Sequence, residues 1–267
     1  MSRPKKSGET SDFAVLFDLE DTLIQTPWSI HEHVLEFRRN TRRKLLALGV
    51  PAEILKGVER ATIMRNKAEA YVGANFNATE TRRFQREMER FLRRYELDSA
   101  RKSRLFPDCI STLETLRRLG AKLGLVTNTS EEAVAIAFKI HRLESFFDAT
   151  VTRENVRKLK PDPEGISFAA KKLGAAHFYM VGDLILDVLA AKGAGAFAIM
   201  INRNVEKSNF TNALKSLPEE VLTGIQERIG SNANLQPDYI IQSLSEIPLI
   251  IEAERQKISG RKQQATL

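Results

Sequence analysis

The chain has 267 residues, of which 42% are hydrophobic, and a formal net charge of +7. This length can bury one large core and a smaller second unit. No apolar run reaches the roughly 18 residues of a membrane-spanning helix, so we expect a globular protein without a membrane segment. We expect no secretory signal in 1–12, and Cys109, the only cysteine, excludes an intrachain disulfide and favours a cytoplasmic location.

Short apolar runs recur along the chain and predict buried strands at 13–17, 121–126, 149–152, 178–181, 196–201 and 239–241. Amphipathic helical patterns stand between most of them, for example at 107–119 and 166–173. This alternation predicts a parallel sheet with helices on both faces. In such a sheet the reactive groups gather at the carboxyl ends of the strands.

The segment 28–104 breaks the alternation, since its helical periodicity without strands predicts an all-helical insert. Asn77 and Glu80 form a capping-box pattern ahead of an apolar stripe at helical spacing. Residues 71–76 contain glycine and asparagine and predict a loop that reaches over the sheet. The insert has 18 Lys plus Arg against 10 Asp plus Glu, giving +8, which we interpret mainly as a solvated face and secondarily as a surface that attracts anions.

The remaining segments complete the predicted organisation. Residues 202–236 form a second insertion, on the surface, with one helix near 218–229. Flexible tails are expected at 1–12 and 256–267, which leaves 13–27 and 105–255 as the α/β core domain.

Two carboxylates follow predicted strands and are candidates for a shared metal site. Asp18 comes directly after 13–17, and Asp183 follows 178–181 with Gly182 between them. At neighbouring strand ends these carboxylates would repel each other and raise one pKa. A divalent cation with a preference for oxygen ligands, for which Mg²⁺ is the candidate, removes this conflict.

Three further residues are candidates for binding an anion at the same edge. Thr127 ends a predicted strand and, with Asn128, can donate to a phosphoryl oxygen at the start of the next helix. Lys160 precedes Pro161, which fixes the chain and directs the ammonium group toward the same pocket.

Four segments of the chain resemble, in this order, the motifs of the haloacid dehalogenase superfamily. They are Asp18-Leu19-Glu20-Asp21-Thr22, Thr127-Asn128, Lys160-Pro161-Asp162-Pro163 and Gly182-Asp183 through Asp187. The position of the helical insert resembles the cap of its phosphoglycolate-phosphatase-like branch. The resemblance implies a three-layer α/β/α Rossmann-like core with an all-helical cap domain over 28–104. It also implies a Mg²⁺-dependent phosphatase that acts on a small phosphorylated metabolite.

The resemblance also implies a role for each motif residue. Asp18 would attack phosphorus and form an aspartyl-phosphate, while Thr127, Asn128 and Lys160 stabilise charge on the transferring group. Mg²⁺ would be held by Asp18, the backbone carbonyl of Glu20 and Asp183, with Asp187 in a supporting role.

Glu20 departs from the family pattern, which has an aspartate at this position as general acid and base. The extra methylene displaces the carboxyl group, and a displacement of about 1 Å can cost roughly a hundredfold in rate. We therefore expect either slowed turnover or a pocket adjusted to the longer side chain.

Two other functions stay open. A dehalogenase of the same superfamily would share the nucleophile, but the resemblance implies no metal and a non-acidic residue at position 20 for such enzymes. A non-catalytic regulator or nucleic-acid-binding protein is supported only by Glu20 and the basic insert, so nucleic acid is the less favoured partner.

Overall fold

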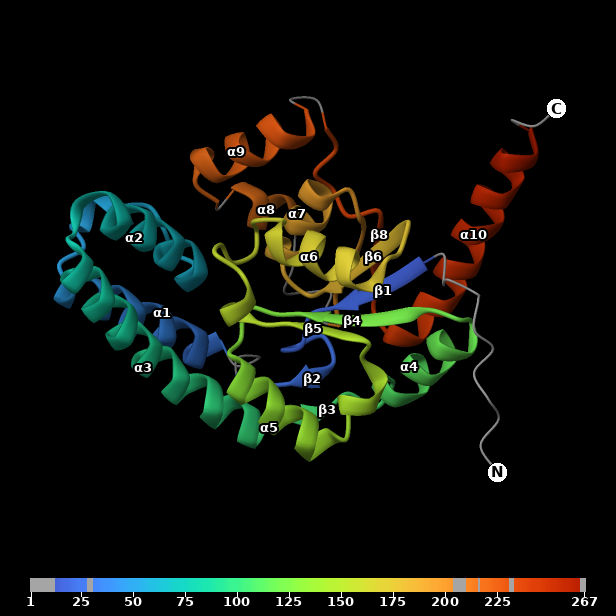
Figure 1. Ribbon diagram of the computed structural model, residues 1–267, viewed down its shortest axis with the longest axis horizontal. Coiled ribbons are helices and arrows are strands. Elements are labelled where there is room, and N and C mark those ends of the chain that lie inside the picture. The colour runs from blue at the N-terminus through green and yellow to red at the C-terminus, as the bar shows by residue number, and fades with distance from the viewer. Residues whose placement is uncertain (1–12, 28–30, 204–209, 216, 231–232, 265–267) are drawn as a thin grey trace.

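The computed structural model describes residues 13–27, 31–203, 210–215, 217–230 and 233–264. Its centre is a six-stranded sheet (Figure 1) in the order β5-β4-β1-β6-β7-β8, with every neighbouring pair parallel. The strands are β1 (Phe13–Phe17), β4 (Lys122–Val126), β5 (Ala149–Val151), β6 (His177–Gly182), β7 (Phe197–Ile201) and β8 (Tyr239–Ile241). The predicted α/β fold with a parallel sheet is therefore confirmed.

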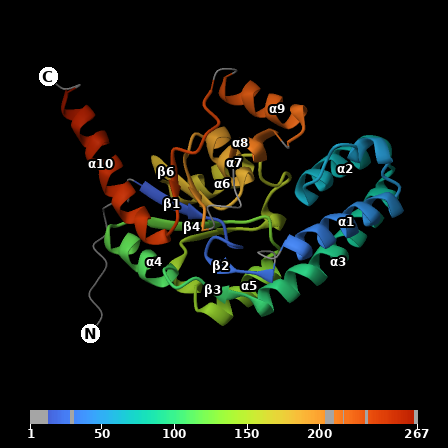
Figure 2. The same cartoon turned by 180° about the vertical axis from the view of Figure 1, so that it is seen from behind.

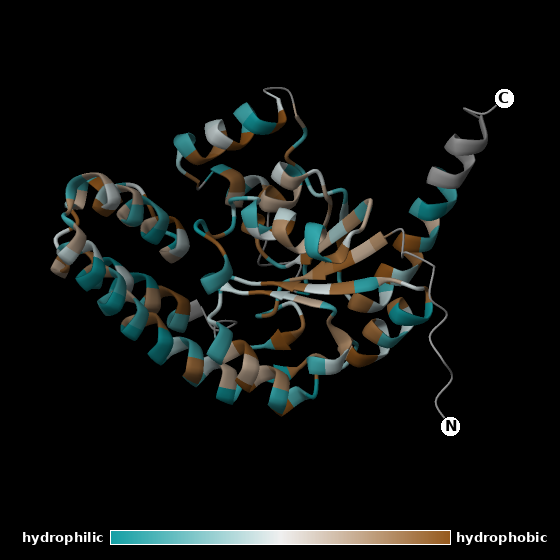
Figure 3. Ribbon diagram, viewed as in Figure 1, coloured by the Kyte–Doolittle hydropathy of each residue, from teal (hydrophilic) through white to brown (hydrophobic). Residues whose placement is uncertain are grey.

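Helices cover both faces of this sheet (Figures 1 and 2). Ala14 and Leu16 of β1 pack toward α6 (Glu164–Leu173) and α7 (Ile185–Ala194). The alternate residues of β1 pack toward α4 (Cys109–Arg118), α5 (Glu131–His141) and α10 (Ile247–Gln264). Because both faces are covered, β1 is a continuous apolar run, and Figure 3 shows this strand in brown tones, at the hydrophobic end of the scale.

The helical insert consists of α1 (His31–Ala47), α2 (Ala61–Asn75) and α3 (Ala78–Lys102), with a short 3₁₀ turn at Ala52–Leu55. The predicted capping box at the start of α3 forms, since Asn77 Oδ1 accepts from the Thr79 and Glu80 amides and Glu80 accepts from the Asn77 amide. The loop predicted at 71–76 is wrong, because residues up to Asn75 continue α2. Val72 is buried there, and a single glycine in a helix is tolerated.

A two-residue antiparallel ladder joins the two ends of the insert. It pairs β2 (Ile24–Gln25) with β3 (Arg104–Leu105). The ladder holds together the segments through which the chain enters and leaves the insert. Strands of two residues have no periodic pattern, so the sequence did not predict them.

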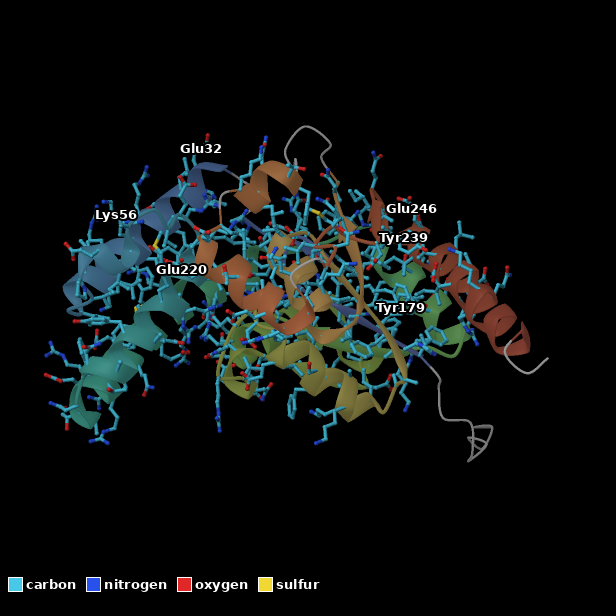
Figure 4. All side chains as sticks on the ribbon, turned by 90° about the horizontal axis from the view of Figure 1, so that it is seen from above. Glu32, Lys56, Tyr179, Glu220, Tyr239 and Glu246 are labelled. Atoms are coloured by element: carbon cyan, nitrogen blue, oxygen red, sulfur yellow. The ribbon has the colours of Figure 1, made fainter. Side chains whose placement is uncertain are left out.

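The second insertion contains α8 (Phe210–Lys215) and α9 (Glu219–Ile229). The helix predicted near 218–229 is confirmed as α9, whereas 204–209, 216 and 231–232 lie outside the described residues. Figure 4 shows Glu220 on the part of α9 near the helical insert, and its carboxylate lies 3.2 Å from Lys67 Nζ of α2.

The two expected tails have different outcomes. The first, 1–12, lies outside the described residues. The second, 256–267, is helical as far as Gln264, because α10 continues through a segment rich in Arg, Lys and Gln, all good helix formers. Among the helices that the structure describes, none combines the length and the apolar character needed to cross a membrane.

Candidate active site

Three of the four motifs begin where neighbouring strands end. Asp18, Thr127 and Asp183 directly follow β1, β4 and β6, and β1 lies between the other two. Asp18 N donates to Val181 O at 2.9 Å and Thr127 N donates to Val151 O at 3.0 Å, so the sheet positions both residues. All three side chains therefore lie at one edge of the sheet, in agreement with the sequence prediction.

Lys160 brings the third motif to this edge. Its buried ammonium donates to Asp18 Oδ1 at 2.7 Å, Asp187 Oδ1 at 2.6 Å and the carbonyl of Val126 at 2.9 Å. Burial disfavours the charged ammonium, but Asp18 and Asp187 outweigh burial and raise the pKa of Lys160. The Asn128 side chain makes two hydrogen bonds with the backbone of Lys160. It accepts from the Lys160 N–H at 3.0 Å and donates to the Lys160 carbonyl at 3.3 Å.

Asp18, Asp183 and Asp187 form a cluster in which one carboxylate oxygen of each lies within 4.8 Å of the others. Burial raises the pKa of Asp18 to about 6, although Lys160 opposes this. Burial and the charges of Asp187 and Asp18 raise the pKa of Asp183 well above its ordinary value. Three carboxylates against one ammonium leave an excess of negative charge at this point.

This donor set suits a hard divalent cation. Carboxylate oxygens are the ligands that Mg²⁺ prefers, and a cation would relieve the repulsion that raises the pKa of Asp183. Asp187 already uses both oxygens, one on Lys160 and the other on the backbone N–H of Leu184 at 3.0 Å. Asp18 and Asp183 are therefore the candidate direct ligands, and Asp187 braces Lys160 and the start of α7.

Glu20 is held at both carboxyl oxygens. Ser99 Oγ of α3 donates to Oε1 at 3.1 Å, and Thr129 Oγ1 donates to Oε2 at 2.9 Å. Burial and the nearby Glu96 carboxylate raise the pKa of Glu20 to about 8, although the hydrogen bond from Thr129 opposes this. A carboxyl group with this pKa is largely protonated at neutral pH and can donate a proton.

The Thr127 hydroxyl accepts a hydrogen bond from the Thr129 backbone N–H at 3.3 Å. Its own proton can therefore be donated to a ligand. Sequence reasoning did not find Ser99 and Thr129. No motif signal marks them, because Ser99 lies within a helix of the insert and Thr129 lies just outside the Thr127-Asn128 motif.

These motif residues line a cavity of about 270 Å³ between the sheet edge and the helical insert. The core contributes Asp18, Glu20, Thr127, Asn128, Lys160, Asp183 and Asp187, and α1, the start of α2 and α3 contribute the opposite wall. The structure thus brings all predicted site residues to one cavity.

Comparisons with known proteins agree with the motifs. The sequence profile of the haloacid dehalogenase-like hydrolases matches residues 15–201, and a second profile, described as HAD-hydrolase-like, matches residues 159–247. A pyrophosphatase PpaX of Bacillus velezensis is 40% identical over 86 residues, which are 32% of this chain and 40% of that protein. The plasmid phosphoglycolate phosphatase of Cupriavidus necator is 29% identical over 185 residues, 68% of this chain and 77% of that protein.

Five pyrophosphatases PpaX from Bacillus and Oceanobacillus species are matched over 40% to 59% of their length, so the chain spans about half of these relatives. Among solved structures, an HAD phosphatase from Thermococcus onnurineus is 26% identical, with a TM-score of 0.50 over 89% of this chain and 97% of that one. The profile match extends from the first strand to the last residue of β7. The resemblance inferred from the motifs is confirmed, and the chain belongs to the haloacid dehalogenase-like hydrolase family.

Proposed function

We propose that this protein is a Mg²⁺-dependent phosphatase, located in the cytoplasm, that hydrolyses a small phosphate monoester through an aspartyl-phosphate on Asp18. One observation carries the proposal. The Asp18 carboxylate stands at the end of the central strand, fixed by the Lys160 ammonium at 2.7 Å, beside two more carboxylates in a cavity of about 270 Å³.

Asp18 is the nucleophile in this proposal. Lys160 holds Oδ1, which orients the carboxylate and leaves Oδ2 for attack on phosphorus. The Thr127 hydroxyl and the Lys160 ammonium face the same cavity and offset negative charge on the transferring group. Bound to Asp18, Asp183 and the carbonyl of Glu20, Mg²⁺ would supply further charge compensation and orient the phosphoryl group.

Glu20 is the general acid and base. Its raised pKa of about 8 keeps the carboxyl protonated at neutral pH, as protonation of a leaving-group oxygen requires. After the ester bond breaks, the resulting carboxylate can take a proton from the water that attacks the aspartyl-phosphate. Ser99 and Thr129 hold the carboxyl at both oxygens, which supports a pocket adjusted to glutamate.

The helical segment 28–104 acts as the cap domain over a core domain of 13–27 and 105–255. The chain enters and leaves this segment at the β2–β3 ladder, and α1 to α3 supply one wall of the cavity. The single buried thiol, Cys109, suits a reducing compartment.

Phosphate release from p-nitrophenyl phosphate tests the proposal. We expect turnover with Mg²⁺, its loss with excess chelator, and a fall of at least about a thousandfold in Asp18→Asn, which keeps the side-chain volume but removes the nucleophile. Circular dichroism checks that the variant is folded. Turnover that persists in Asp18→Asn or in chelator would contradict this function.

A further inference from the structure

The wall of the cavity opposite the carboxylates contains three arginines. Arg38 lies on α1, Arg60 directly precedes α2 and Arg65 lies in its first turns, and all three line the cavity. In Figure 1 the strands of the sheet run toward these helices. Acidic and basic walls therefore face each other across a narrow space.

Three polar atoms on this wall are buried and make no hydrogen bond: Thr41 Oγ1, Arg60 Nε and Arg65 Nη1. Thr41 is only 1% exposed, and it also lines the cavity. Leaving a buried donor unpaired is unfavourable, so such atoms are rare in native proteins. All three can donate a hydrogen bond, which indicates that a ligand rich in acceptors completes this wall.

The charges on this wall are also unbalanced. Arg65 donates through Nε to Glu69 at 2.6 Å, whereas neither Arg38 nor Arg60 forms an ion pair with a carboxylate of the described residues. Burial, and then the positive charge of Arg38, lower the pKa of Arg60 and outweigh the opposing charges of Asp183 and Glu59. Two partly buried guanidinium groups that repel each other are stabilised when an anion lies between them.

We propose that Arg38, Arg60 and Arg65, together with Thr41, form a second anion site that binds a carboxylate or phosphate group at the far end of the substrate. This inference rests on the proposed phosphatase function and narrows its substrate class. The substrate is a small phosphate ester, or a diphosphate, with a second anionic group. The cavity volume of about 270 Å³, at the small end for ligand sites, leaves room for only a few atoms between the two anions.

A pair of probes that differ only in the distal group tests the site. Ethyl phosphate has a methyl group where 2-phosphoglycolate has a carboxylate. We expect kcat/KM to be roughly 10- to 100-fold higher for 2-phosphoglycolate, as for a hydrogen-bonded charged group. Inorganic pyrophosphate is a third probe, and its rate relative to 2-phosphoglycolate tells whether the distal group is a phosphate or a carboxylate.

Variants assign the effect to the arginines. In Arg60→Gln and Arg38→Gln we expect kcat/KM for 2-phosphoglycolate to fall by roughly 10-fold or more, chiefly through KM, and by clearly more than kcat/KM for ethyl phosphate. Arg39→Gln is the matched control, because Arg39 is exposed on the same helix and does not line the cavity. It should behave as wild type.

Two results would overturn the second anion site. One is a wild-type enzyme that prefers neither 2-phosphoglycolate nor pyrophosphate to ethyl phosphate. The other is an equal loss for ethyl phosphate and 2-phosphoglycolate in the arginine variants, which would mean that these arginines act on the transferring phosphoryl group itself.

Calorimetric binding separates this inference from the phosphatase proposal. In the Asp18→Asn background with Mg²⁺, 2-phosphoglycolate should bind more tightly than ethyl phosphate, and Arg60→Gln should remove most of that difference. Tight, arginine-dependent binding without turnover in the wild type would keep the anion site and refute the phosphatase. Turnover of ethyl phosphate without any arginine-dependent difference would do the reverse.

Discussion

The Glu20 carboxyl group occupies a position defined by two hydroxyls, Ser99 Oγ at 3.1 Å and Thr129 Oγ1 at 2.9 Å. Shortening the side chain by one methylene in Glu20→Asp withdraws the carboxyl by about 1 Å from both donors. We therefore expect Glu20→Asp to be no faster than wild type, and Glu20→Gln to lose about a hundredfold in kcat because it lacks the proton. Steady-state kinetics on ethyl phosphate, whose alkoxide leaving group needs a proton, measure both. A faster Glu20→Asp would mean that the longer side chain is a handicap and not an adaptation.

Gly182 leaves the space in which the Asp187 carboxyl lies. A Cβ atom at this position would stand 2.3 Å from Asp187 Cγ, a distance that side chains do not adopt. Gly182→Ala must move Asp187 and with it the Lys160 ammonium, so we expect at least a tenfold loss of kcat and a cost of about 1–3 kcal/mol in stability. Gly224→Ala in α9 is the control, because nothing lies within 4 Å of its Cβ. Equal behaviour of the two variants in kinetics and thermal denaturation would contradict this account.

Helix α3 is tied to the core by ion pairs around Arg153, which is 3% exposed in its side chain and belongs to the 3₁₀ turn Arg153–Asn155. Its guanidinium binds Glu96 and, at 2.9 Å, Glu89, both on α3. Removing one partner of a buried pair leaves an uncompensated charge. We expect Arg153→Met to lower the free energy of unfolding by about 3 kcal/mol, measured by urea denaturation.

A matched pair of variants separates buried charge from lost packing. Adding Glu96→Gln to Arg153→Met removes the unpaired carboxylate and should restore part of the stability. The control is Arg117→Met, which breaks the ion pair between Arg117 and Asp148. Their side chains are 39% and 35% exposed, so we expect the free energy of unfolding to fall by less than about 1 kcal/mol. If Arg153→Met costs no more than Arg117→Met, the ion pairs of Arg153 do not contribute to holding α3 on the core.

Across the whole molecule, the sequence predicts features that neighbouring residues encode, and it does not predict contacts that depend on how distant segments pack. The parallel sheet follows from apolar runs buried on both faces, and the convergence of Asp18 with Asp183 follows from strands that end at one edge. The hydroxyls that hold Glu20 could not be predicted, since Ser99 reaches Glu20 only through the placement of α3 on the core. The same holds for Arg60, whose unpaired Nε has meaning only once the opposite wall of the cavity is known.

Asp108 joins three distant segments of the core, because its carboxylate accepts from Arg203 at 3.1 Å and from Ser243 Oγ and Leu244 N at 2.8 Å each. Burial alone would raise the pKa of Asp108, but these hydrogen bonds outweigh it and lower the pKa below its ordinary value of 3.8. The stabilisation is therefore fully present above pH 3.8 and is lost as the pH falls through the lower, folded-state value.

Asp108→Asn tests this link between charge and stability. At pH 7 we expect Asp108→Asn to lower the free energy of unfolding, measured by urea denaturation, by about 1 to 2 kcal/mol. The effect is limited because solvent partly screens the side chain. As the pH falls from 3.8 through the lower, folded-state pKa, the gap between wild type and variant should narrow, because wild-type Asp108 then becomes neutral as well. Asp98→Asn, on an exposed side chain of α3, should change stability by less than about 0.5 kcal/mol at either pH. A gap for Asp108→Asn that is independent of pH would show that shape, and not the carboxylate charge, holds these three segments together.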